Sequence, residues 1–530
     1  MTQTGLPRAD EEKRLRILQI PFHPFFLAPL VVLAEFQVVK QVILPETTIL
    51  TFIAVEVLTA VVYAVAFLWS QNLHKAAFLA TIWSVLFFSY TAVQLSLSSL
   101  VGGVLTPEIV LAAYITLAVI VLAATQKNTW RFGHKQLVMP FETITRALNP
   151  VSLVLLIVNT IPIATYYVGM AQLTEPAKKK ICHLGQEVNL SATGSKPDVY
   201  YIIVDGCAHP STMKEVCGYD NHEFIEFLKR KGFYVVDKAT SNYNCTELSL
   251  CSSLNMEYLD PLPKQLGSDF QGFVPPWLVC HAGSVPRLFQ KLGYKFINIC
   301  SFSCGTDIFP GADTNWYPNS ANHFLVATAI NTPLSATEQF VPLLRTMYAG
   351  SQDSQARALA DVVTAPSPKF VLFHTDMTHP PYLRDQFGRP LPLKLVGMQS
   401  DWGRAVDYGH QIQFAETRIR QWIELILSKS ANPPVIIIQG DHGPGEFVDV
   451  DKIQHPPSEV RMKILNAYYF PGAQAHSPAQ LYDSITPVNS FRVVFNHFFS
   501  ANLPLLKDHA YWPAKDRPYD WTDIRDQIRF

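Results

Sequence analysis

The sequence predicts a multi-span α-helical membrane domain followed by an α/β domain with a largely parallel central sheet covered by helices. Long apolar runs fill the first 170 residues, and short apolar strands alternate with amphipathic segments from residue 198 onward. With 530 residues, the chain exceeds one ordinary hydrophobic core. Its net charge of −1 gives no polyanion-binding surface, so we expect no nucleic-acid partner.

The membrane domain is expected over residues 1–170. A transmembrane helix needs about 20 predominantly apolar residues, and five stretches meet this requirement. The first is the least regular, because Pro24, Pro29, Glu35 and Lys40 interrupt it. The five candidate spans cover residues 24–43, 47–69, 76–98, 104–125 and 151–170.

The basic residues predict the orientation, because cytoplasmic loops are enriched in Lys and Arg. The short loops after the first and third spans contain neither residue type. We therefore expect a multi-pass protein of the cell membrane with a cytoplasmic N-terminus and an extracytoplasmic domain after residue 170. Lys178–Lys180 depart from this pattern and can lie against anionic headgroups. The basic residues on the expected cytoplasmic side are Lys13, Arg14, Arg16, Lys75, Lys127, Arg131, Lys135 and Arg146.

All eight cysteines lie between Cys182 and Cys304. An even number confined to one region favours disulfide bonds in an oxidising compartment, which agrees with an extracytoplasmic location. Buried free thiols are the alternative.

Residues 171–197 form an expected linker, and residues 198–530 an expected catalytic domain. The alternation of strands and helices favours a largely parallel sheet, which binds ligands at the carboxyl ends of its strands. The expected strands are Val199–Val204, Phe233–Val236, Tyr294–Ile299, Phe370–Phe373, Val435–Ile438 and Leu465–Phe470. The expected helices lie near residues 222–231, 284–292 and 408–428.

Two strand ends carry metal-binding residue types. Asp205 follows the apolar run Val199–Val204, and the pair Asp441-His442 closely follows Val435–Ile438. A carboxylate beside an imidazole suits Zn²⁺ or Mn²⁺ better than Mg²⁺ or Ca²⁺. The alternative is a polar turn at each strand end.

Thr246 stands where a polar loop enters an apolar segment, which predicts a position near a helix N-terminus. A helix N-terminus attracts anionic phosphate groups, and a divalent cation would make the hydroxyl available as a nucleophile. The alternative is a simple helix N-cap.

Together, these residues resemble the alkaline phosphatase superfamily, in particular its sulfatase-like branch with lipoteichoic acid synthases and lipid A phosphoethanolamine transferases. The resemblance covers roughly residues 197–500, and the preceding spans match the transferase architecture. It implies a catalytic Thr246 and one Zn²⁺ or Mn²⁺ ion, with a second ion possible. The implied metal ligands are Asp205, Thr246, Asp441 and His442, with Asp205 replacing the Glu of those transferases.

The same resemblance implies three substrate-binding histidines. His379 would contact the phosphate of the substrate, His455 is similar to a substrate or second-metal histidine, and His374 could support either role. Formylglycine sulfatases use a Cys or Ser in a C/S-x-P/A-x-R context, which neither Cys245 nor Cys251 has. A true sulfatase is therefore not expected.

The expected function is transfer of a phosphoethanolamine- or phosphoglycerol-type headgroup from a membrane lipid to an envelope glycan or lipid through a covalent Thr246 intermediate. A hydrolase with the same site would use water as the acceptor. A different class, a non-catalytic membrane binding or sensory protein, would not need the intact set of acid, Thr and Asp-His. The sequence leaves the headgroup, the acceptor and the oligomeric state open.

Overall fold

A computed structural model describes residues 20–101, 106–126, 129–132, 135–188, 190, 196–300, 305–316, 323–337, 340–391, 402–472 and 480–530. The chain forms two compact units. The membrane unit contains residues Met1–Lys40, Pro45–Val168 and His323–Val341. The sheet unit contains Gln41–Leu44, Gly169–Asn322 and Pro342–Phe530. Of the residues that predicted the orientation, Lys13, Arg14, Arg16 and Lys127 lie outside the described ranges.

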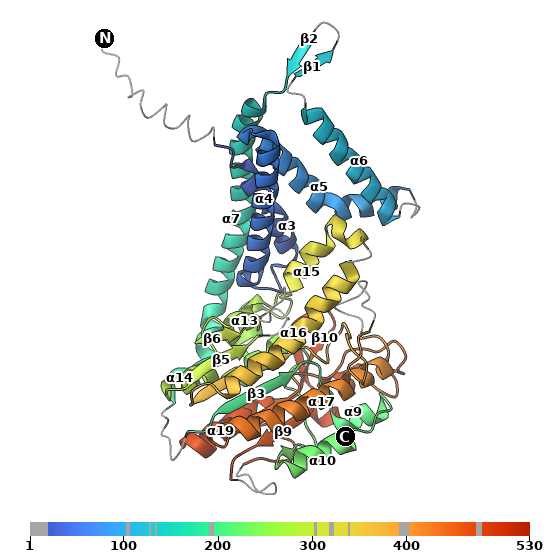
Figure 1. The fold of residues 1–530 in the computed structure, drawn as a ribbon. Coiled ribbons are helices and arrows are strands. Elements are labelled where there is room, and N and C mark those ends of the chain that lie inside the picture. Colours follow the sequence, from blue (N-terminus) through green and yellow to red (C-terminus); the bar gives the residue numbers. More distant parts are fainter. Residues whose placement is uncertain are drawn as a thin grey trace, which may run out of the picture. The chain divides into compact units, whose positions relative to one another are not determined.

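The membrane unit consists mainly of apolar helices (Figure 1). Within the described ranges, four helices are long and apolar enough to cross a membrane: Pro45–Ser70, Leu73–Leu100, Pro107–Gln126 and Phe141–Ile181. They correspond to the last four expected spans. The elements are α2 (His23–Leu27), α3 (Leu30–Val39), η1 (Pro45–Thr48), α4 (Ile49–Ser70), α5 (Leu73–Leu100), α6 (Pro107–Gln126), a hairpin of β1 (Thr129–Phe132) and β2 (Lys135–Val138), and α7 (Phe141–Ile181).

Two boundaries differ from the sequence-based expectation. The first expected span is a shorter apolar stretch, His23–Val39, divided into α2 and α3 around Pro29. Proline lacks the amide hydrogen that would continue the helix. In contrast, α7 continues to Ile181, so the first part of the expected linker is helical. Three lysines in its last turn favour this extension, because they complement the helix dipole.

The stretch His23–Val39, which is divided at Pro29, runs alongside α7. Near its start, the Asn149 side chain accepts hydrogen bonds from the Phe22 and His23 amides at 3.3 and 3.1 Å. At its end, the Tyr167 hydroxyl donates to the Lys40 carbonyl at 2.8 Å. Asn149 and Tyr167 are 18 residues apart on α7, or about 27 Å at 1.5 Å per residue. The stretch therefore covers a depth close to the roughly 30 Å hydrocarbon core of a bilayer.

A segment from much later in the chain packs among these helices. It comprises α15 (His323–Ile330) and η2 (Pro333–Ala336), and α15 contacts α3 and α4 (Figure 1). Glu35 of α3 accepts hydrogen bonds from the Thr328 hydroxyl and, at 2.8 Å, from the Asn331 side chain. The segment falls inside the expected catalytic domain of residues 198–530, yet it clusters with the membrane helices. These bonds give the Glu35 carboxylate polar partners and explain its place in an apolar helix.

The core of the sheet unit is a seven-stranded sheet with the order β4-β9-β8-β3-β7-β5-β6. Pairs β3–β7, β3–β8, β5–β7 and β5–β6 are parallel, whereas β4–β9 and β8–β9 are antiparallel. This confirms the predicted largely parallel sheet and all six predicted strands, and adds β6. The strands are β3 (Val199–Val204), β4 (Tyr234–Val235), β5 (Lys295–Ile299), β6 (Thr314–Trp316), β7 (Lys369–Thr375), β8 (Val435–Gln439) and β9 (Asn466–Tyr469).

Helices pack around this sheet, and β3, β7 and β8 are buried along their whole length. A strand buried on both faces is a continuous apolar run, which is why β3 and β8 were recognisable in the sequence. The three predicted helices correspond to α10, α14 and α17. The helices are α8 (Leu184–Glu187), α9 (Pro210–Glu215), α10 (His222–Arg230), α11 (Thr246–Asn255), α12 (Pro261–Leu266), α13 (Val274–Cys280), α14 (Ser284–Lys291), α16 (Phe340–Val363), α17 (Ala405–Lys429), α18 (Pro457–Met462) and α19 (Pro487–Phe499), with η3 (Arg525–Gln527) and the β10 (Tyr511–Ala514)–β11 (Arg517–Asp523) hairpin near the C-terminus.

The predicted disulfide bonds are not found among the described cysteines, and this prediction is wrong for them. Cys182, Cys207, Cys217, Cys245, Cys251, Cys280 and Cys300 are free thiols, and all except Cys245 are buried; Cys304 lies outside the described ranges. Free cysteine behaves as a small apolar residue, so an even count in one region reflects core packing here. The alternative of buried free thiols is the one observed.

Candidate metal centre

The carboxyl ends of two neighbouring parallel strands bring the predicted metal ligands together. Asp205 directly follows β3, and Asp441 and His442 follow β8. Asp205, Asp441 and His442 are buried and can each direct one ligand atom to a common point, since these atoms lie within 4.8 Å of one another. The geometry is that of the ligand-binding edge of a parallel sheet.

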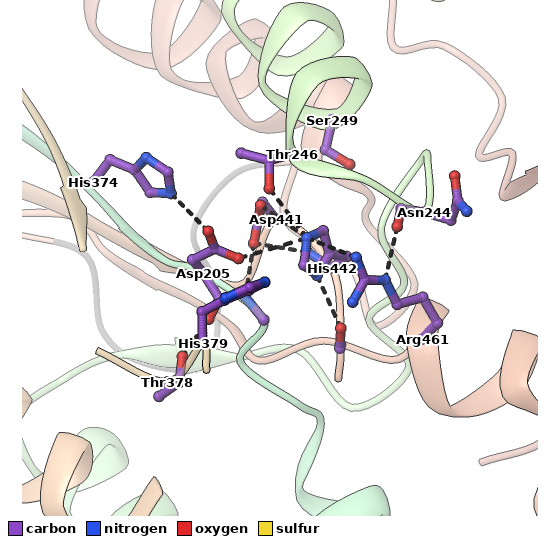
Figure 2. A network of polar contacts seen from close by, with 12 residues as sticks. Asp205, Asn244, Thr246, Ser249, His374, Thr378, His379, Asp441, His442 and Arg461 are labelled. Atoms are coloured by element: carbon purple, nitrogen blue, oxygen red, sulfur yellow. Dashed lines mark hydrogen bonds and ion pairs between the residues drawn. The ribbon is translucent and has the colours of Figure 1, made fainter. Parts of the chain in front are cut away.

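Nε2 of His442 lies close to oxygen atoms of the other three predicted ligands (Figure 2). The Thr246 hydroxyl is 3.1 Å from it, Oδ1 of Asp205 is 3.5 Å away, and Oδ2 of Asp441 is 3.4 Å away. Ligand atoms of a tetrahedral zinc site, with bonds of about 2.0–2.1 Å, are separated by about 3.3 Å. The three distances from Nε2 of His442 are therefore close to the spacing around a tetrahedral metal ion.

The hydrogen bonds around this cluster orient the imidazole and the carboxylates toward its centre. Nδ1 of His442 is 2.9 Å from the Gly443 carbonyl and can only donate to it, so Nε2 keeps its lone pair. Oδ1 of Asp441 accepts hydrogen bonds from the Gly206 and His442 amides, each at 3.0 Å. Within the described chain, Oδ2 of Asp441 and Oδ1 of Asp205 are buried without a hydrogen-bond partner. Buried carboxylate oxygens of this kind fit a bound divalent cation.

Thr246 is the first residue of α11, and Cys245 occupies the N-cap position without a side-chain cap. The simple N-cap alternative is therefore not observed. The Thr246 hydroxyl lies beside His442 instead, at a helix N-terminus that favours an incoming anion.

The surroundings of the cluster shift the pKa values of its two carboxylates in opposite directions. Burial and, second to it, the neighbouring Asp205 charge raise the pKa of Asp441 to about 6. Burial also acts to raise the pKa of Asp205, but His379 and the hydrogen bond to His374 outweigh it and lower the pKa. The pKa of His442 lies well below its usual value because of burial and the Arg461 charge, which keeps the imidazole neutral and able to bind a metal.

We predict that metal affinity depends on pH through Asp441. Because a metal must displace the Asp441 proton, affinity for Zn²⁺ or Mn²⁺ should fall about tenfold per pH unit below about pH 6 and level off above it. Isothermal titration of the metal-free protein from about pH 5 to pH 8 measures this dependence. An affinity that stays constant across pH 6 would contradict the assignment of Asp441 as a ligand.

The three predicted substrate histidines occupy different places. His379 follows β7, packs against Trp402 with ring centroids 4.9 Å apart, and lies beside Asp205 in Figure 2. His374 is fully buried: Nδ1 is 2.7 Å from the Thr306 hydroxyl, and Nε2 is 3.5 Å from Oδ2 of Asp205. This position suits orientation of Asp205 rather than direct contact with a substrate.

His455 is not brought into the cluster. Its ring lines a small cavity together with Glu446, Phe447 and Lys452. Among the described contacts, its amide bonds to the Asp451 carbonyl at 2.9 Å, and none joins it to the four predicted ligands.

Two further residues border the cluster: Arg461, which sequence reasoning missed, and Trp402, which it considered as a headgroup contact with packing as the alternative. Arg461 of α18 reaches His442, with Nη2 3.1 Å from Nε2. Trp402 is buried and packs against two glycines, because a Cβ at Gly206 or Gly445 would lie 2.5 or 2.3 Å from its ring. Gly206 also has a φ of +72°, which favours glycine. Arg461 does not follow a strand, so no strand-end pattern indicated it.

Comparison with known proteins gives structural neighbours only. No family model and no curated protein matches the sequence. One similar solved structure is the zinc complex of the C-terminal periplasmic domain of EcEptC from Escherichia coli, with a TM-score of 0.44 and 13% identity over 65% of this chain and 97% of that chain. The lipoteichoic acid synthase LtaP from Listeria monocytogenes has a TM-score of 0.36 and 12% identity, covering 65% and 81%. The periplasmic domain of phosphoethanolamine transferase EptC from Campylobacter jejuni has a TM-score of 0.37 and 11% identity, covering 59% and 93%.

Proposed function

We propose that the protein is a membrane-anchored, metal-dependent transferase that moves a phospho-substituted headgroup from a membrane lipid to an envelope glycan or lipid. One observation carries this proposal: the Thr246 hydroxyl lies 3.1 Å from Nε2 of His442, within the Asp205, Asp441 and His442 cluster. A nucleophile positioned inside a metal site is the arrangement needed for covalent phosphoryl transfer. The class of headgroup, phosphoethanolamine or phosphoglycerol, follows from the sequence resemblance.

The proposed reaction has two displacements. A divalent ion held by Asp205, Thr246, Asp441 and His442 would supply Lewis-acid chemistry, which stabilises negative charge on oxygen. Thr246 Oγ attacks phosphorus, the bond from phosphorus to the lipid oxygen breaks, and the released lipid alcohol takes up the proton that Thr246 lost. An acceptor hydroxyl then attacks the same phosphorus, breaks the bond to Thr246 and gives its proton back to the threonine. His379 holds the phosphate in both steps.

Product analysis tests the proposal against hydrolysis. Purified, metal-loaded protein is incubated with phosphatidylethanolamine or phosphatidylglycerol, with and without a candidate envelope acceptor, and products are weighed by mass spectrometry. We expect diacylglycerol together with a modified acceptor. Free phosphoethanolamine or glycerol phosphate at the same rate without acceptor would identify a hydrolase. The absence of diacylglycerol with either lipid would contradict both donor classes.

We also propose that the membrane unit crosses the bilayer five times. The stretch from Ile20 to Lys40 runs beside α7 between Asn149 and Tyr167, so it covers the same depth as that span. An odd number of spans, with the basic loops on the cytoplasmic side, gives an extracytoplasmic sheet unit.

Two fusions test this topology. A periplasm-active reporter fused after residue 197 should be active, and a fluorescent protein that folds only in the cytoplasm should fluoresce at the N-terminus. If both ends report the same side, the stretch from Ile20 to Lys40 does not cross and the number of spans is even. An inactive reporter after residue 197 together with no fluorescence at the N-terminus would indicate the opposite orientation.

A further inference from the structure

Arg461 presents a cation to the candidate metal centre. Its Nε donates to the Asn244 carbonyl at 2.8 Å, and its guanidinium lies over the Trp402 ring, 5.4 Å from the centroid. Its Nη2 lies 3.1 Å from Nε2 of His442 (Figure 2). The carbonyl and the indole therefore fix the guanidinium so that one edge faces the cluster.

The guanidinium has no carboxylate partner among the described residues. The ion pairs of the described chain include one for the buried Arg492, which binds Glu257, but none for Arg461. Buried arginines are usually paired with an anion. The carboxylates that act electrostatically on the half-buried Arg461 include those of Asp441 and Asp205, which form no ion pair with it among the described residues and would be neutralised by a bound metal ion.

The contact between Arg461 and His442 cannot persist when a metal occupies the cluster. Since Nδ1 of His442 donates to Gly443, Nε2 has a single lone pair, and a metal ion would take it. The Nη2 donor of Arg461 would then need another acceptor. It lies no more than 6.2 Å from the Thr246 hydroxyl, because each is 3.1 Å from the same nitrogen (3.1 + 3.1).

We propose that Arg461 binds a non-bridging oxygen of the phosphoryl group that Thr246 attacks. A phosphoryl group bonded to the threonine would lie between the two side chains, where it would replace the acceptor that the metal takes away and bring negative charge to the guanidinium. The planar guanidinium suits two adjacent phosphate oxygens better than an ammonium does. Trp402, held against Gly206 and Gly445, is a positioning residue for this guanidinium. The inference rests on the proposed phosphoryl transfer and identifies a residue that recognises its substrate.

Binding of inorganic phosphate to the full-length, metal-loaded protein tests this inference without requiring turnover. We expect Arg461→Gln to weaken phosphate binding about 10- to 100-fold, the range for loss of a charge-assisted hydrogen bond, with metal content and thermal unfolding unchanged. Arg461→Lys keeps the positive charge but loses the planar pair of donors, so this variant should bind phosphate with intermediate affinity. Arg404→Gln is the matched control, because it removes an exposed arginine of the same unit that pairs with Asp407.

The outcomes separate this inference from the proposed function. Phosphate affinity in Arg461→Gln and Arg461→Lys equal to that of Arg404→Gln would overturn the inference, even if headgroup transfer is observed. A loss of metal in both Arg461 variants at unchanged phosphate affinity would likewise overturn it and indicate a structural role. A selective loss of phosphate binding in a protein that shows no transfer would support the anion site and contradict the transferase.

Discussion

Replacing Thr246 with alanine should reduce headgroup transfer by several orders of magnitude. The variant lacks the oxygen that attacks phosphorus, and loss of a nucleophile in a cooperating site costs far more than one contact. Thr246→Ser keeps the hydroxyl and should retain measurable activity. Initial rates, together with the mass of the protein after incubation with donor lipid, measure both effects. Wild-type protein should gain the mass of the headgroup phosphate, and Thr246→Ala should gain none.

The Thr246→Ala protein should remain folded. Thr246 is the first residue of α11 and not its cap, and alanine has the better helix propensity, so the change in unfolding free energy should stay within about 1 kcal/mol. Ser249→Ala is a matched control one turn further along α11, because it removes a hydroxyl that bonds to the Tyr243 carbonyl at 3.0 Å. Activity of Thr246→Ala within a few-fold of Ser249→Ala would exclude covalent catalysis through Thr246.

The strand ends were predictable because two physical signals coincide there. The runs before Asp205 and Asp441 are apolar on both faces, which is required of central parallel strands, and each is followed by an acidic residue. The position of Thr246 could be predicted from the change from polar loop to apolar segment. These three signals are local in sequence, so they need no knowledge of the tertiary structure.

Arg461 and the α15–η2 segment were not predictable, because their positions depend on contacts between residues that are far apart in the sequence. Arg461 lies in the six-residue helix α18, and its role depends on the approach of Asn244, 217 residues away. The apolar helix α15 has the composition of any buried helix. Its place among membrane helices is set by Thr328 and Asn331 binding to Glu35, nearly 300 residues earlier. The prediction of disulfide bonds failed for a related reason, because pairing depends on the distance between two thiols and not on the number of cysteines.

The second large effect is expected at Asp441, where the loss of one oxygen ligand can be separated from damage to the loop. Oδ1 of Asp441 anchors the Gly206 and His442 amides, whereas Oδ2 is free and lies 3.4 Å from Nε2 of His442. Asp441→Asn keeps an oxygen for the two amides but replaces the charged carboxylate with an amide that has a much weaker affinity for Zn²⁺ or Mn²⁺. Asp441→Ala removes both functions.

Both Asp441 variants should lose metal and transfer activity, with metal affinity falling by at least about 100-fold, since even residues outside the ligand set often change it 10- to 100-fold. Asp441→Asn should unfold at nearly the wild-type temperature, whereas Asp441→Ala should be less stable because two amides lose their acceptor. Elemental analysis of the purified proteins and metal titration measure the first effect, and calorimetry measures the second. Asp449→Asn is the control, because Asp449 accepts a bond from the Ala405 amide and is not one of the predicted ligands. One tightly bound metal ion per chain in Asp441→Asn would remove the Asp441 carboxylate from the ligand set, because Asp205, Thr246 and His442 together with a water molecule would then be sufficient to hold the ion.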